Sequence, residues 1–132
     1  MGKNLVIVGG GAGGASTAAE AKRNDSSLNV TILQEGKFVS YASCPTPYFI
    51  GDIIKDENKL IARTPEKFRE GGIDVQLNTE VINISHSENI VVTKDLRQFP
   101  YDILVMATGT SAFIPDMSGI KADVPVAITR MS

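Results

Sequence analysis

The stretch Leu5-Val-Ile-Val-Gly-Gly-Gly-Ala-Gly-Gly-Ala15 joins an apolar run to a glycine turn and then to a run of small residues. It predicts a parallel strand buried on both faces, followed by a helix from about Gly11 to Asn24. Gly9, Gly11 and Gly14 form a Gly-x-Gly-x-x-Gly, which allows a tight turn, close approach of backbone N–H groups to a pyrophosphate, and close helix–strand packing. The positive end of the helix can then hold an anion without a basic side chain.

The rest of the chain predicts one α/β domain around this unit. Apolar runs at 28–33, 73–77 and 101–109 predict further parallel strands, whereas the alternating segments 80–85, 90–94 and a piece near 99 predict a small antiparallel meander. A helix is expected from Thr64 as cap to Gly71 as stop, and 56–63 is expected to be a polar connection. The strand at 101–109 can re-enter the central sheet beside the first strand, which would bring Thr108 and Gly109 to the same crevice as the glycine turn.

Composition excludes several classes of partner. The chain has 132 residues, 42% of them hydrophobic, and a net charge of −2 with 13 scattered Lys and Arg, so neither nucleic acid nor a membrane surface is an expected partner. No apolar run reaches the length of a membrane span. A single cysteine is compatible with the reducing cytoplasm. The one histidine, His86, falls in a predicted turn, and we assign it no catalytic or metal role.

The second predicted strand ends at a polar pair. A dinucleotide fingerprint places an acid about 20 residues past its third glycine, where it binds the ribose hydroxyls. That position is Gln34, and Glu35 follows it. Either Gln34 binds the ribose as a neutral group, or a shift of one residue brings Glu35 into that role.

Cys44 is the only thiol of the chain, and Pro45 and Pro47 follow it. Prolines are tolerated in the first turn of a helix, so we expect a helix from about Pro45 to Ile54 with Cys44 at its N-terminus. The helix dipole would there stabilise a nucleophilic thiolate. The alternative is that Cys44 is a small buried hydrophobic residue.

The first predicted helix has an inner face of small residues and an opposite polar face. Ala12, Ala15, Ala18 and Ala19 would pack on the sheet, while Ser16, Glu20 and Arg23 share the polar face. Taken alone, that face indicates solvation with an ordinary Glu20–Arg23 ion pair.

Three motifs together resemble the N-terminal FAD-binding half of the flavin-dependent pyridine nucleotide-disulfide oxidoreductases, in particular the single-cysteine branch of coenzyme A-disulfide reductases. They are Val6–Ser16, Ser40-Tyr-Ala-Ser-Cys44 with Pro47–Gly51, and Tyr101-Asp102 leading to Ala107-Thr-Gly109 and Pro115. The resemblance implies a Rossmann-like domain, with a central parallel sheet flanked by helices and a small meander. It also implies FAD as cofactor, NAD(P)H as co-substrate, and Cys44 as the redox cysteine. The implied FAD-binding positions are Gly9, Gly11, Ala12, Gly13, Gly14, Gln34, Glu35, Val81, Thr108 and Gly109.

The resemblance also gives the polar face of the first helix a second interpretation. It implies coenzyme A contacts at Ser16, Glu20, Arg23, Ser40 and Ser43, with a small-molecule disulfide as substrate. Glu20 stands where a neutral amide is expected and would repel a phosphate, whereas Arg23 would attract one. Related NADH oxidases and peroxidases carry a histidine at the position of Ala12, so this alanine favours disulfide chemistry.

The resemblance divides the chain into an FAD-binding domain over 1–114 and, over 115–132, a linker with the start of an NAD(P)H-binding domain. It implies an FAD-dependent oxidoreductase that forms homo-oligomers. The 132-residue chain by itself is expected to be inactive. Two alternatives stay open: a nucleotide-binding or self-associating domain without redox activity, and a piece of an NADH oxidase-like or peroxidase-like flavoprotein.

Overall fold

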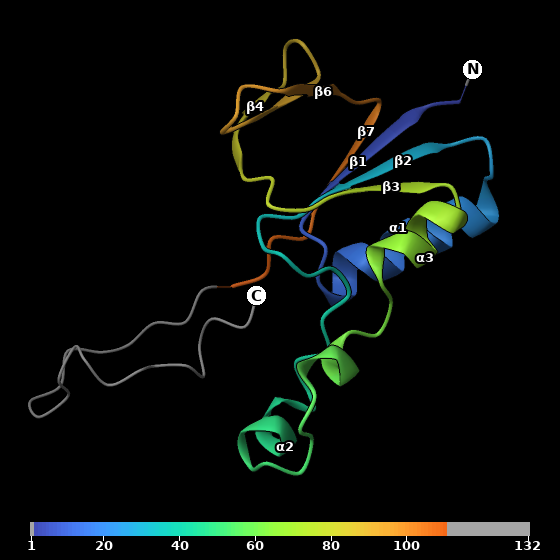
Figure 1. Ribbon diagram of the computed structural model, residues 1–132. Coiled ribbons are helices and arrows are strands. Elements are labelled where there is room, and N and C mark those ends of the chain that lie inside the picture. Colours follow the sequence, from blue (N-terminus) through green and yellow to red (C-terminus); the bar gives the residue numbers. More distant parts are fainter. Residues whose placement is uncertain (1, 111–132) are drawn as a thin grey trace, which may run out of the picture.

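A four-stranded parallel sheet forms the centre of the molecule, which the computed structural model describes over residues 2–110 (Figure 1). Its order is β3-β2-β1-β7, and a second, antiparallel sheet has the order β4-β5-β6. The parallel strands are β1 (Asn4–Val8), β2 (Asn29–Leu33), β3 (Ile73–Gln76) and β7 (Ile103–Met106), and the antiparallel strands are β4 (Val81–Ser85), β5 (Ile90–Thr93) and β6 (Gln98–Pro100). The helices are α1 (Ala12–Asn24), α2 (Thr46–Ile50), the 3-10 helix η1 (Glu57–Leu60) and α3 (Pro65–Glu70).

The central sheet is covered on both faces, as a run of apolar residues without alternation predicts. Leu5 and Ile7 of β1 pack with Ala15 and Ala18 of α1 and with Phe68 of α3. Successive side chains of a strand point to opposite faces, and the alternate residues Val6 and Val8 pack with Val91 of the meander. The fold is therefore three layers: the helices α1 and α3, the parallel sheet, and the meander (Figure 1).

The predicted α/β fold is confirmed, including the return of the last strand to the sheet. Leu5 pairs in parallel with Val30 of β2 and with Ile103 of β7, so β7 lies beside β1. The Thr64 hydroxyl accepts a hydrogen bond from Lys67 N at 3.5 Å and caps α3, which Gly71 ends. The boundary at 114 and the expected linker at 115–132 lie outside the described residues.

Two local predictions were wrong. The helix expected over 45–54 is only the five residues of α2, because the backbone turns at Asp52 (φ 60°) and the N–H groups of Ile53 and Ile54 both donate to the Tyr48 carbonyl. The segment 56–63 is not simply a polar connection, since η1 places Leu60 at zero exposure. Leu60 O also accepts from Ala42 N at 2.7 Å, which ties η1 to the segment that leads to Cys44.

Candidate functional site

The glycines of the turn between β1 and α1 differ in backbone conformation and in the space around them. Gly9 has φ 100°, and a Cβ there would lie 2.2 Å from the Ala107 carbonyl oxygen. A Cβ on Gly14 would lie 1.8 Å from the carbonyl oxygen of Gly9, so the helix packs directly on the turn. By contrast, a Cβ on Gly11 or Gly13 would meet no described atom within 4 Å. The fold thus requires glycine at 9 and 14, while 11 and 13 leave open space in front of the helix.

A hollow of about 150 Å³ opens at the carboxyl ends of β1 and β2, and we call it the nucleotide hollow. Parallel α/β sheets bind ligands at this edge. The hollow brings together five of the predicted cofactor residues from four separate segments of the chain. They are Gly9, Gln34, Glu35, Val81 and Thr108, and the remaining lining residues are Val8, Leu33, Gly36, Thr79 and Glu80.

The two polar residues at the end of β2, Gln34 and Glu35, have different surroundings. Gln34 Oε1 accepts a hydrogen bond from the N–H of Gly10 at 2.7 Å, so this amide oxygen holds the glycine turn. Glu35 is exposed on the lining of the same hollow. Of the two sequence alternatives, the structure therefore leaves the Glu35 carboxylate facing solvent at the hollow and gives the Gln34 oxygen a partner within the fold.

The other predicted cofactor residues are not among those that line this hollow. Gly11 precedes the first residue of α1 and has extended backbone (φ −68°, ψ −164°), and Gly13 is exposed in its first turn. Gly109 has φ 67°, and a Cβ there would meet no neighbouring described atom within 4 Å. Ala12 is exposed and lines a different hollow, so its expected place on the inner face of the helix was wrong; Gly14, Ala15 and Ala18 form that face.

That second hollow, of about 400 Å³, lies between α1 and the segments around Ser40 and Arg63, and we call it the helix hollow. It brings together four of the five predicted substrate residues: Ser16, Glu20, Arg23 and Ser40. Its remaining lining residues are Ala12, Ala15, Ala19, Tyr41, Ala42, Ala62, Arg63 and Phe68. The polar face of α1 therefore borders a concave surface and is not simply a convex solvated face.

The charges of the helix hollow are partly paired. Arg23 Nη1 lies 2.5 Å from Glu20 Oε2, and Asn24 Nδ2 donates to the other carboxylate oxygen at 2.8 Å. Arg63 stacks its guanidinium 5.1 Å from the centre of the Phe68 ring and has no carboxylate partner among residues 2–110. Sequence patterns did not single out Arg63, because it enters the hollow from a loop without regular periodicity.

Cys44 is exposed, so the alternative of a small buried hydrophobic residue is wrong for the described chain. It lies two residues before α2, whose single turn is much shorter than the expected helix and supplies a correspondingly weaker dipole. Ser43 is exposed as well, and neither Ser43 nor Cys44 lines the nucleotide hollow or the helix hollow.

Ser40 links the cysteine segment to the glycine turn. Its N–H donates to the carbonyl of Gly10 at 2.7 Å, and its own carbonyl accepts from Ala62 N at 2.9 Å. Its φ of 56° is uncommon for a residue with a side chain and is maintained only where surrounding contacts fix it. The segment that carries Cys44 is thus anchored to the same turn that borders the nucleotide hollow.

Within residues 2–110, no three His, Cys, Asp or Glu side chains come together as a metal site would require. None of the helices in that range combines the length and apolar character needed to cross a bilayer.

Comparison with known proteins places the chain in a family. The family model for pyridine nucleotide-disulphide oxidoreductases matches residues 3–130. The chain is 35% identical to an NADH oxidase of Methanocaldococcus jannaschii, over 89% of this chain and 28% of that protein. It is 33% identical to the coenzyme A disulfide reductase of Staphylococcus epidermidis, over 82% of this chain and 26% of that protein.

Solved structures agree with this placement. The reduced CoADR-RHD of Bacillus anthracis matches with a TM-score of 0.81 at 29% identity, over 89% of this chain and 22% of that chain. An NAD-dependent persulfide reductase from A. fulgidus matches with a TM-score of 0.83 at 32% identity, over 91% of this chain and 24% of that chain. The chain thus spans between a quarter and a third of the curated relatives that it matches. It belongs to the pyridine nucleotide-disulphide oxidoreductase family, as an FAD-binding domain of that family.

Proposed function

We propose that this domain binds FAD at the glycine turn and the nucleotide hollow, and that it serves an enzyme that reduces a small-molecule disulfide with NAD(P)H. One observation carries the cofactor assignment: five residues from four distant segments line one hollow, next to a helix start where Gly11 and Gly13 leave space that the fold does not use. Such space lets backbone N–H groups approach a pyrophosphate. The residues present therefore fit a dinucleotide.

The residues around the nucleotide hollow would each bind a different part of the cofactor. The turn at Gly11 and Gly13 would hold the pyrophosphate, and the exposed carboxylate of Glu35 would accept hydrogen bonds from the ribose hydroxyls. Val81 and Thr108 line the hollow from the meander side and from the end of β7. FAD, when bound, supplies a relay for two electrons from NAD(P)H.

Titration with FAD and FMN tests this cofactor assignment. FMN lacks the adenosine diphosphate half that the turn and Glu35 would hold, so we expect FAD to bind at least about 100-fold more tightly than FMN. Flavin fluorescence during titration of the protein gives both constants. Equal binding of the two would contradict the assignment. Protein that takes up neither FAD nor ADP, and sediments as an oligomer whether or not FAD is present, would support the self-associating alternative.

Cys44 is the proposed nucleophile of the parent enzyme. Its thiolate would attack one sulfur of the substrate disulfide, so that a bond forms between Cys44 and that sulfur, the substrate S–S bond breaks, and the other half leaves as a thiolate. Two electrons that originate from NAD(P)H then break the mixed disulfide and release the second half. The exposure of Cys44 supports this role, because an attacking thiol must be accessible to a second molecule.

The helix hollow is the proposed site for part of that substrate. Relatives of this chain are named coenzyme A disulfide reductases, and Arg23 and Arg63 give the hollow two cations that suit phosphate groups. The Glu20 carboxylate would weaken phosphate binding, because it already pairs with Arg23. We propose that coenzyme A disulfide binds here although its phosphate groups compete with Glu20 for Arg23.

Replacing Glu20 with glutamine should therefore strengthen substrate binding. An exposed ion pair contributes up to about 1 kcal/mol, so the KM of the parent enzyme for coenzyme A disulfide should fall about two- to fivefold in its E20Q variant, with kcat unchanged. The matched control is Glu66→Gln, which removes a carboxylate beside Arg69 at the same i,i+3 spacing but outside both hollows. A KM that rises in E20Q, or that changes equally in the control, would contradict the proposal.

A further inference from the structure

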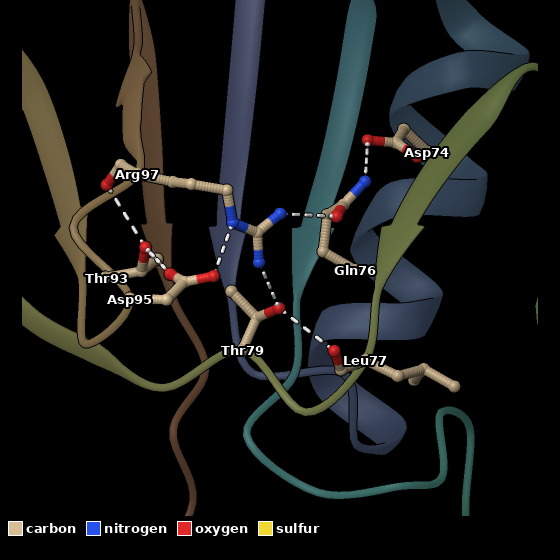
Figure 2. Close-up of polar contacts among 7 residues, drawn as sticks. All are labelled: Asp74, Gln76, Leu77, Thr79, Thr93, Asp95 and Arg97. Carbon is tan, nitrogen blue, oxygen red and sulfur yellow. Dashed lines mark hydrogen bonds and ion pairs between the residues drawn. The ribbon is translucent and has the colours of Figure 1, made fainter.

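Arg97 lies in the turn between β5 and β6, and its guanidinium connects three segments of the chain (Figure 2). Nε donates to Asp95 Oδ2 at 2.7 Å, Nη1 to Gln76 Oε1 at 2.9 Å, and Nη2 to Thr79 Oγ1 at 3.0 Å. The same guanidinium lies 5.5 Å from the centre of the Phe99 ring. Because the donors of arginine have a fixed fork geometry, this arrangement sets the distance between the meander and the end of β3.

The turn that carries Arg97 is itself held in place. The Thr93 hydroxyl, which is fully buried, lies 2.5 Å from Asp95 Oδ1 and 3.1 Å from the Arg97 carbonyl oxygen (Figure 2). The hydrogen bond from Thr93, together with the guanidinium of Arg97, lowers the pKa of the Asp95 carboxyl below its ordinary value. Asp95 therefore stays charged at neutral pH and continues to orient the arginine.

Two of the acceptors of Arg97 are connected to the wall of the nucleotide hollow. Thr79 lines the hollow, and Gln76 binds the main chain of Gln34, which also lines it. Thr79 is 2% exposed and lines the hollow, and its hydroxyl donates to the Leu77 carbonyl at 3.0 Å while it accepts from Arg97. Gln76 ends β3, and its carbonyl accepts from the N–H of Gln34 at 2.9 Å. Thr79 N donates in turn to the Gln34 carbonyl at 2.8 Å.

The backbone of Gln34 is thus held on both sides by residues that Arg97 contacts, and the Gln34 side chain holds the glycine turn. The path runs from Arg97 to Gln76 and Thr79, then to the main chain of Gln34, and from Gln34 Oε1 to Gly10 N at 2.7 Å. Each step is a hydrogen bond between directly contacting groups. A displacement of the meander would therefore move the hollow wall and the turn together.

We propose that Arg97 is a positioning residue for dinucleotide binding: it contacts no ligand, but its three-way clamp fixes the wall of the nucleotide hollow and, through Gln34, the glycine turn. This role rests on the proposed binding of FAD. Sequence patterns did not indicate it, because Arg97 lies in an exposed turn that looks like ordinary solvated surface. Arg97 is not among the residues that line the hollow, so the role we assign to it is geometric.

Replacing Arg97 with lysine tests the clamp, since lysine keeps the charge but loses the fork. We expect R97K to weaken binding of both FAD and ADP about tenfold, because an ammonium group cannot serve three acceptors in these directions. Arg69→Lys is the matched control: Arg69 is similarly exposed (50% against 44% for Arg97) and donates to the same strand, at Val75 O, but lines neither hollow. R69K should change both dissociation constants less than about twofold.

A second comparison separates positioning from a general loss of stability. In a Thr79→Val background, which lacks the hydroxyl that Arg97 contacts, R97K should weaken FAD binding clearly less than it does in the wild-type protein, because the two changes remove the same contact. Should R97K fail to fold, Gln76→Ala removes one acceptor of the clamp and should weaken FAD binding about threefold.

The outcomes distinguish this inference from the function on which it rests. Wild-type protein that binds neither FAD nor ADP contradicts the proposed function and the role of Arg97 with it. Wild-type protein that binds FAD, with R97K and R69K weakening it by the same factor, overturns the role of Arg97 alone. Fully additive effects of R97K and Thr79→Val would overturn it as well.

Discussion

Gly14→Ala is expected to destabilise the domain by about 3 kcal/mol or more, which is a large part of the stability of an ordinary domain of this size. The added Cβ would lie 1.8 Å from the carbonyl oxygen of Gly9. That oxygen belongs to backbone held in a turn with φ 100° at Gly9, so no flexible side chain can yield. Either α1 moves away from β1 or the turn distorts, and both disrupt the packing of Ala15 and Ala18 on the sheet.

Gly13→Ala is the matched control, one residue away in the same helix. Its Cβ would meet no described atom within 4 Å, and alanine is a better helix former than glycine by up to about 1 kcal/mol. We therefore expect G13A to be as stable as the wild-type protein or more stable. Urea unfolding followed by circular dichroism measures both. If the two variants unfold at the same urea concentration, the account of close helix–turn packing is wrong.

Cys44→Ser is expected to abolish disulfide reduction by the parent enzyme, with a loss on the order of 10³-fold or more in kcat. A serine hydroxyl is not ionised near neutral pH and is a poor nucleophile toward sulfur, whereas Cys44 is the only thiol of this chain and is exposed. Disulfide-dependent oxidation of NAD(P)H measures the loss.

FAD binding by the variant is the control for Cys44→Ser. Cys44 does not line the nucleotide hollow, so the variant should retain the same FAD content and the same dissociation constant for FAD as the wild-type enzyme. A C44S enzyme that keeps more than a tenth of the wild-type rate would contradict the nucleophile assignment. A C44S enzyme that loses FAD would show that the cysteine segment supports cofactor binding. The lower rate would then follow from the loss of FAD and would not support Cys44 as the nucleophile.

The central sheet could be predicted because its signals are local. β1 and β7 are continuous apolar runs, and the meander strands alternate, so strand type and approximate bounds follow from periodicity. The glycine spacing likewise identified the turn, and the structure gives separate physical reasons for Gly9 and Gly14. The short α2 was not predictable in length, because its end depends on the backbone turn at Asp52.

Only part of the candidate site could be predicted from the sequence, because the rest depends on contacts between distant segments. Ser16, Glu20 and Arg23 share a helix face by their spacing, but their hollow also needs Arg63 and Phe68, which approach from a different segment. The bond from Gly10 to Gln34 and the clamp of Arg97 join residues 24, 21 and 18 positions apart. No periodic pattern encodes such pairings, because they arise only when the layers pack.

An FAD titration of Gly11→Ala beside the wild-type protein tests directly whether the open glycine turn holds a dinucleotide. Gly11 has an ordinary φ of −68° and free space at its Cβ, so alanine there should cost about 1 kcal/mol or less, as the loss of a favourable helix cap, and the protein should stay folded. We expect folded G11A to bind FAD at least about tenfold more weakly, because the methyl group occupies the approach of the pyrophosphate. G11A that binds FAD as tightly as the wild-type protein would contradict binding of the pyrophosphate at this turn.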